Sequence, residues 1–169
     1  MRMVAMWLGL STLCASTIAS GVVACAEPGN DPMRDIHNLS IYIARRPSEV
    51  YAFASDPRNL PLWAAGLAGS RVEQKGDEWI VDAPFGEAKV RFAERNDFGV
   101  LDHDVELESG ITVHNPMRVV PHGDGSEFLF TLIRQPDTSD EQFAADKAAV
   151  ESDLKTLKSL LEQRSGRTD

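Results

Sequence analysis

The chain has 169 residues, 43% of them hydrophobic, and a formal net charge of −9 at pH 7. This length allows one domain with an extension, and the apolar content is sufficient for a packed core. The largest basic cluster is the pair Arg45-Arg46, so a phosphate backbone would meet a repulsive surface, and the sequence predicts no nucleic acid partner.

Both cysteines, Cys14 and Cys25, lie within the first 25 residues. Residues 1–25 begin with one positive charge and continue as an uncharged run rich in Ala, Leu and Val, which is typical of a targeting signal. Five Ser and Thr residues make this run weak as a membrane span. Any domain that follows has no disulfide, thiol nucleophile or cysteine metal site.

Two interpretations of the first 32 residues remain open. Residues 22–25 (VVAC) look like a bacterial lipobox with Cys25 as a lipid anchor, while residues 24–26 (ACA) also suit an ordinary signal peptidase; residues 26–36 would then form a tether. Alternatively, translation starts at Met33 and the upstream stretch is an artefact. The protein is exported under the first interpretation and cytoplasmic under the second.

The first elements are a strand and two short helices. Residues 37–44 alternate, with Leu39, Ile41 and Ile43 on one side, which predicts a half-buried strand. Residues 46–49 (RPSE) open a helix, since proline and an early glutamate suit a first helical turn. The pair Asp56-Pro57 ends this helix, and residues 58–64 form a second short turn.

A six-strand meander follows, with strands separated by turns that contain glycine. The predicted strands are residues 71–74, 78–83, 87–93, 100–107, 111–120 and 127–134. In the third, Lys89 and Arg91 point outward, and in the fourth the row Asp102, Asp104 and Glu106 does so. The two rows would match in charge across neighbouring strands, which supports this register.

The last element is a long amphipathic helix. Residues 139–142 (SDEQ) form a capping box, and the apolar residues that follow share one stripe over about 24 residues. A coiled coil is the alternative, but Lys147 interrupts the seam and three heptads are few. We expect the helix to pack on the sheet. The stripe consists of Phe143, Val150, Leu154, Leu157 and Leu161.

This order of elements resembles the helix-grip fold of the START-like superfamily, also called SRPBCC, which includes polyketide cyclase-like proteins. The likeness is most specific in residues 43–53 (IARRPSEVYAF) and 56–63 (DPRNLPLW), and residues 103–105 and 114–119 look like an uncharacterised bacterial subgroup. No catalytic set is common to the superfamily, so none is transferred.

The resemblance implies an α+β helix-grip domain over residues 37–163, with residues 164–169 as a tail. Its curved antiparallel sheet would have about seven strands, with two short N-terminal helices and one long C-terminal helix. It also implies an apolar cavity between the sheet and the C-terminal helix, and activities that range from lipid carriage to aromatic-ring cyclisation.

His103 and Asn115 are the most informative polar residues. Alternation places each on the inward face of its strand, where an imidazole can hold a ligand hydroxyl or move a proton. If the two strands pair, these side chains could instead satisfy each other as a buried polar pair. His114 falls on the outward face. Trp63 and Phe85 lie beside turns and are candidate cavity walls, together with Trp79, Met117 and Phe130.

Three functions follow as hypotheses. The first is binding of a small hydrophobic or aromatic molecule, the second a cyclase or dehydratase using His103 and Asn115, and the third a docking module like the superfamily's co-chaperone branch. No nucleotide, hydrolase or metalloprotease motif is present, and the four histidines lack metal-ligand spacing. We therefore expect no cofactor and no metal, and a monomer or homodimer.

Overall fold

The computed structural model of the chain describes residues 35–76, 78–84 and 86–163. The targeting segment, both cysteines, the alternative start at Met33 and the candidate wall residue Phe85 lie outside these ranges. None of the helices within them is long and apolar enough to cross a lipid bilayer.

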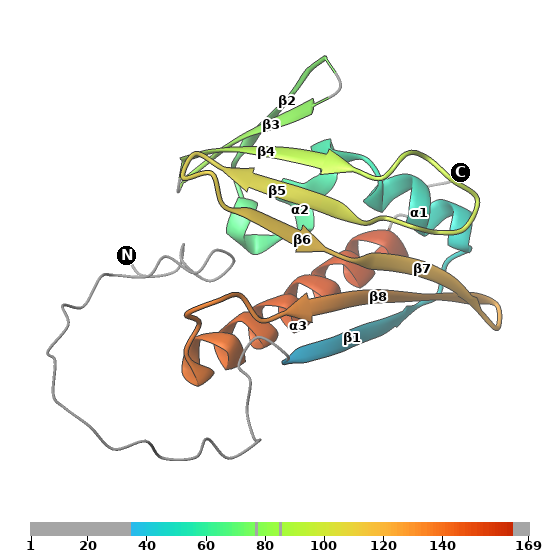
Figure 1. Cartoon of the computed structure of the whole chain (residues 1–169). Coiled ribbons are helices and arrows are strands. Elements are labelled where there is room, and N and C mark those ends of the chain that lie inside the picture. The colour runs from blue at the N-terminus through green and yellow to red at the C-terminus, as the bar shows by residue number, and fades with distance from the viewer. Residues whose placement is uncertain (1–34, 77, 85, 164–169) are drawn as a thin grey trace, which may run out of the picture.

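Eight strands form two antiparallel sheets in the described part of the chain. One sheet has the order β1-β8-β7 and the other β2-β3-β4-β5-β6. Figure 1 shows them side by side as one curved surface. The strands are β1 Ile36–Ile43, β2 Arg71–Lys75, β3 Glu78–Ala83, β4 Gly86–Phe92, β5 His103–Leu107, β6 Thr112–Asn115, β7 Met117–His122 and β8 Gly125–Ile133.

Pro116 explains why the structure has two strands where the sequence predicts one over residues 111–120. Proline lacks the N–H that a ladder requires, so β6 ends at Asn115 and β7 begins at Met117. The join stays bonded on both sides: Pro116 O accepts from Thr131 N at 2.9 Å, and Met117 O accepts from Leu101 N at 3.0 Å. β6 therefore pairs with β5 while β7 pairs with β8.

The fourth meander strand is also shorter than predicted. β5 begins at His103 instead of residue 100, and Val100 makes only an isolated bridge to Arg118. Asn96 organises the preceding segment, since its Oδ1 accepts from Phe98 N at 3.1 Å and from Val100 N at 3.0 Å. These side-chain bonds replace ladder pairing before β5.

The short helices follow the predicted signals. α1 spans Pro47–Ala54, and Glu49 Oε2 accepts from Arg46 N at 3.1 Å at its start. Asp56 Oδ1 accepts from Arg58 N at 3.0 Å, which caps the next turn. Three short pieces then follow: η2 Pro57–Asn59, α2 Leu60–Trp63 and η3 Ala65–Leu67.

The long helix α3 spans Asp140–Gln163, the 24 residues expected. Ser139 Oγ accepts from Gln142 N at 3.2 Å, as a capping box requires. The Gln142 side chain, however, donates forward to Asp146 Oδ1 at 3.0 Å instead of reaching back. All five predicted stripe residues are buried, and Asp153 is buried with them.

The two sheets are covered by different helices. α3 packs mainly on β1 and β8, whereas α2 and η3 lie under the five-stranded sheet (Figure 1). A continuous core of buried side chains joins both halves, with Phe128, Phe130, Met117 and Leu157 among its most deeply buried members.

Candidate functional site

A small cavity of about 40 Å³, called here the His103 pocket, lies under the five-stranded sheet. One wall is the segment of α2 and η3, and the other is formed by strands β3 to β6. Apart from His103 and Asn115, its described lining is apolar. The lining residues are Leu60, Trp63, Ala64, Gly66, Leu67, Val81, Ala88, Val90, His103, Val105, Val113 and Asn115.

This pocket does not lie between the sheet and the C-terminal helix, where the family resemblance implies a cavity; a second, smaller cavity does. α3 supplies none of the described lining residues. It crosses the β1 and β8 half of the sheet, so the short helices cover the other half and close the pocket. The wall is therefore made of short turns and not of a single rigid helix.

Strand alternation places the apolar side chains of neighbouring strands together on the sheet face of the pocket. Val81 pairs with Ala88 across β3 and β4, and Val90 pairs with Val105 across β4 and β5. Val105 in turn pairs with Val113 on β6. Directly opposed residues of paired strands share one face, so a period of two in the sequence becomes a continuous apolar floor.

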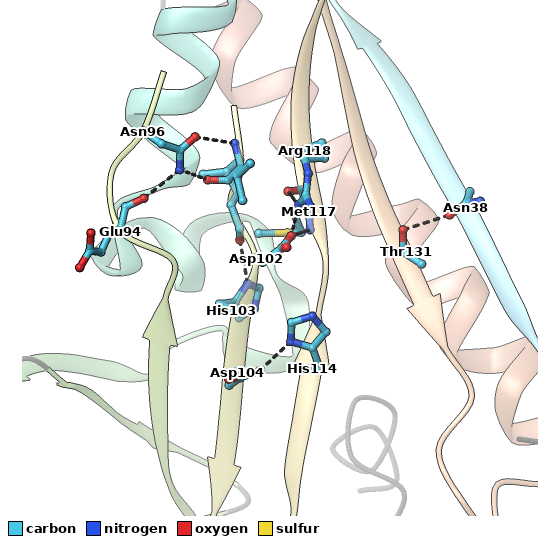
Figure 2. Close-up of polar contacts among 12 residues, drawn as sticks. Asn38, Glu94, Asn96, Asp102, His103, Asp104, His114, Met117, Arg118 and Thr131 are labelled. Atoms are coloured by element: carbon cyan, nitrogen blue, oxygen red, sulfur yellow. Dashed lines mark hydrogen bonds and ion pairs between the residues drawn. The ribbon is translucent and has the colours of Figure 1, made fainter. Parts of the chain in front are cut away.

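His103 and Asn115 lie directly opposite each other in the β5–β6 register. Each is 5% exposed, so their predicted inward orientation is confirmed. The His103 ring stacks on Phe92 at 4.6 Å between centroids. Its Nδ1 lies 3.3 Å from Leu101 O, and because a carbonyl only accepts, Nδ1 carries the proton. Figure 2 shows this ring among its neighbours on β5 and β6.

Burial sets the charge state of His103. Loss of hydration lowers its pKa from 6.5 to about 4, although the Leu101 carbonyl and the Asp104 carboxylate oppose this change. The ring is therefore neutral near pH 7, with Nδ1–H donating and the Nε2 lone pair available as an acceptor.

Two further polar groups on the lining have no bonded partner. Asn115 Nδ2 and Trp63 Nε1 are buried without a hydrogen bond within the described residues. His103 and Asn115 therefore meet in register but do not satisfy each other, contrary to the buried-pair interpretation. Such unpaired buried donors are rare in folded proteins and require an explanation.

The other predicted wall residues are placed differently. Met117 and Phe130 are each 1% exposed and belong to the core, not to the described lining of the His103 pocket. Trp79 is half-buried against the core, with Arg58 stacked over its ring at 6.0 Å. These three are inward-facing residues whose ligand-binding role stays a prediction.

A second small cavity of about 30 Å³, called here the Asp146 pocket, shares Val113 and Asn115 with the first. Its other walls come from His114 on β6, from β8, the following loop and α3, so it occupies the expected place between sheet and long helix. Burial raises the pKa of the Asp146 carboxyl, which faces this cavity, while the bond from Gln142 opposes the change.

Sequence reasoning missed both helix carboxylates that touch this region, Asp146 and Asp153. Asp153 Oδ1 accepts from Ala65 N at 3.0 Å, which ties α3 to the pocket wall. The available signal was position: Asp146 follows Phe143 by three residues, and Asp153 lies three after Val150 and four before Leu157, so both adjoin the apolar stripe at helical spacing.

The outer face of the five-stranded sheet is charged, as the sequence predicts. Lys89 lies 3.8 Å from Glu106 and opposite it in register. His114 is exposed and its Nδ1 lies 2.7 Å from Asp104 Oδ1, so its predicted outward orientation is confirmed (Figure 2). Among the described residues, no cluster of three or more metal-ligating side chains is present.

A larger open groove of about 580 Å³ lies beside α1, away from the His103 pocket. Phe98 is 84% exposed at this groove, and Arg95 stacks over Tyr51 at 5.7 Å. Its lining mixes apolar and charged side chains, in contrast to the apolar lining of the His103 pocket.

Comparison with known protein families identifies one family that matches most of the chain. The profile of the family described as polyketide cyclase / dehydrase and lipid transport matches residues 37–162. No curated protein sequence matches the chain.

Solved structures give the same fold. A START superfamily protein from Mycobacterium smegmatis is 13% identical with a TM-score of 0.61, covering 76% of this chain and 98% of that one. XoxI from Bacillus cereus is 15% identical with a TM-score of 0.59, covering 77% and 97%. The Aha1 dimer from Colwellia psychrerythraea is 17% identical with a TM-score of 0.58, covering 76% and 96%.

Proposed function

This chain belongs to the polyketide cyclase / dehydrase and lipid transport family, and on that premise we propose that it binds a small apolar molecule in the His103 pocket. The observation that carries the proposal is an apolar lining that holds three unsatisfied or half-satisfied polar side chains: His103, Asn115 and Trp63. A largely apolar cavity with few convergent polar groups is the usual form of a small-molecule site.

The volume limits what fits without movement. A cavity of about 40 Å³ has room for about three water-sized groups, whereas an apolar cavity that holds a benzene ring measures about 150 Å³. A ring-sized ligand therefore displaces the α2–η3 wall or extends past Asn115 into the Asp146 pocket. The wall is suited to this because its helices have four and three residues.

Binding is favoured over catalysis by the charge state of the lining. His103 is the one titratable side chain on the described lining, and its pKa of about 4 makes it a weak base near neutrality. A docking function through the outer sheet face is not favoured either, because that face carries the pairs Lys89–Glu106 and His114–Asp104 instead of an apolar patch.

Native mass spectrometry of the protein purified from its own host tests the proposal. We expect a retained small molecule on the unmodified protein and its loss in Ala88→Leu, which fills the pocket floor where Ala88 is 2% exposed. Ala144→Leu on the exposed face of α3 is the matched control and should retain the molecule. A protein that carries no molecule and takes up no apolar compound would refute the proposal.

A further inference from the structure

Three residues that line the His103 pocket, His103, Asn115 and Trp63, carry polar atoms whose bonding is incomplete in the described part of the chain. Two are donors, Trp63 Nε1 and Asn115 Nδ2. The third is the Nε2 acceptor of His103, whose other nitrogen is engaged with Leu101 O. The two donor atoms are fully buried, so bulk water does not satisfy them.

The positions of His103 and Asn115 define the group that would satisfy both. They are directly opposed on neighbouring strands, so a single ligand atom between them can reach each side chain. A hydroxyl donates one hydrogen bond and accepts others, so it would donate to Nε2 and accept from Nδ2. A carbonyl oxygen can only accept, and would leave Nε2 unsatisfied.

The rest of the lining limits the charge of the ligand. It contains no charged side chain among its described residues, and a carboxylate or an ammonium group would lose its hydration without gaining a counterion. A neutral molecule loses far less, and its apolar part can contact Val81, Val90 and Val105 on the pocket floor.

We propose that the His103 pocket selects neutral hydroxyl-bearing molecules, phenols or alcohols, whose hydroxyl group binds between His103 Nε2 and Asn115 Nδ2. The inference rests on the proposed function and names the chemical class of its ligand. The Trp63 N–H is a second donor on the same lining, so a further carbonyl or ether oxygen on the ligand has a partner as well.

The test compares three ring probes of similar size on the full chain: phenol, toluene and benzoate. Binding is followed by ¹H–¹⁵N NMR, with the Asn115 side-chain amide and the Trp63 indole N–H as reporters. We expect phenol to bind at least about tenfold more tightly than toluene, since a ligand without the hydroxyl leaves the same buried groups unpaired. Benzoate should bind more weakly than either.

Substitutions at Asn115 and His103 test whether the preference for phenol over toluene depends on these two side chains. Asn115→Leu should lower the phenol-to-toluene ratio, because the hydroxyl then keeps only its bond to His103 Nε2, while toluene binding persists and shows that the variant is folded. His103→Gln retains an acceptor oxygen and should keep more of the preference than His103→Phe, which leaves only the Asn115 bond. If one variant fails to fold, the other carries the same test.

The outcomes separate the two proposals. Equal affinity for phenol and toluene would overturn the hydroxyl inference while leaving an apolar-ligand function intact. Tightest binding of benzoate would overturn the requirement for a neutral ligand. Failure of all three probes, together with a protein that carries no molecule from its host, would overturn the binding function itself.

Discussion

Asp153, in the middle of α3, accepts a hydrogen bond from the backbone N–H of Ala65 over 3.0 Å. Asp153 is 2% exposed, while Ala65 is exposed, so the bond is partly buried. It joins the long helix to the first residue of η3 and therefore fixes one point of the wall of the His103 pocket to α3.

Replacement of Asp153 by alanine should destabilise the fold by about 1–3 kcal/mol, because the Ala65 N–H loses its acceptor in a part-buried position. Asp153→Asn keeps an acceptor oxygen and should cost less. The free energy of unfolding is measured by urea titration with circular dichroism. Glu151→Ala, an exposed neighbour on the same helix, serves as the control, and equal losses at positions 151 and 153 would contradict the role given to this bond.

His103 should make stability dependent on pH in a defined window. Its pKa is about 4 in the folded protein and about 6.5 when unfolded, so between these values the unfolded state binds more protons. The contribution of His103 to stability should be fully present above about pH 6.5 and fall by about 3 kcal/mol as the pH drops to 4.

The comparison with His103→Gln isolates this contribution, since lost carboxylate interactions affect both proteins at low pH. Urea titrations at pH 7, 6, 5 and 4 should give a difference between the two proteins that grows as the pH falls. A constant difference over this range would show that His103 is not desolvated in the folded state.

Replacement of Arg134 should lower the free energy of unfolding more than replacement of the exposed Arg58. The Arg134 side chain is 5% exposed and donates to Asp35 Oδ2 at 2.7 Å, to Asp140 Oδ1 at 2.6 Å and to the Thr138 carbonyl. Arg134→Met should cost about 1–3 kcal/mol because the carbonyl loses its donors while the two carboxylates return to water. Arg58→Met removes an exposed pair with Asp56 and should cost less than about 1 kcal/mol. Similar values for both variants would contradict this ranking.

Gly99 should not tolerate a side chain. Its φ is +70°, and a Cβ would lie 2.0 Å from the Val119 carbonyl oxygen. Gly110 has a similar φ of +82° but open space around it, so Gly110→Ala should cost only the left-handed conformation, about 1–2 kcal/mol. Gly99→Ala should cost about 1–3 kcal/mol more, because the backbone must also move. Thermal unfolding of the two variants compares them directly, and equal losses would mean that the contact relaxes freely.

The sequence by itself determined which side chains face the interior of each strand. His103, Asn115, Val90 and Val113 were placed correctly because successive residues of a strand point to opposite faces. The charge match between Lys89 and Glu106 followed from the same period of two, and α3 followed from its apolar stripe and its serine cap.

Only the tertiary structure decided what covers each half of the sheet. An apolar stripe shows that a helix face is buried but not against which partner. The family resemblance implied a cavity under α3, and the structure has one there, the Asp146 pocket, while the turns between Leu60 and Leu67 line the His103 pocket. The bond from Ala65 to Asp153 joins residues 88 positions apart. Such a contact depends on how the layers pack, and a local pattern does not contain that information.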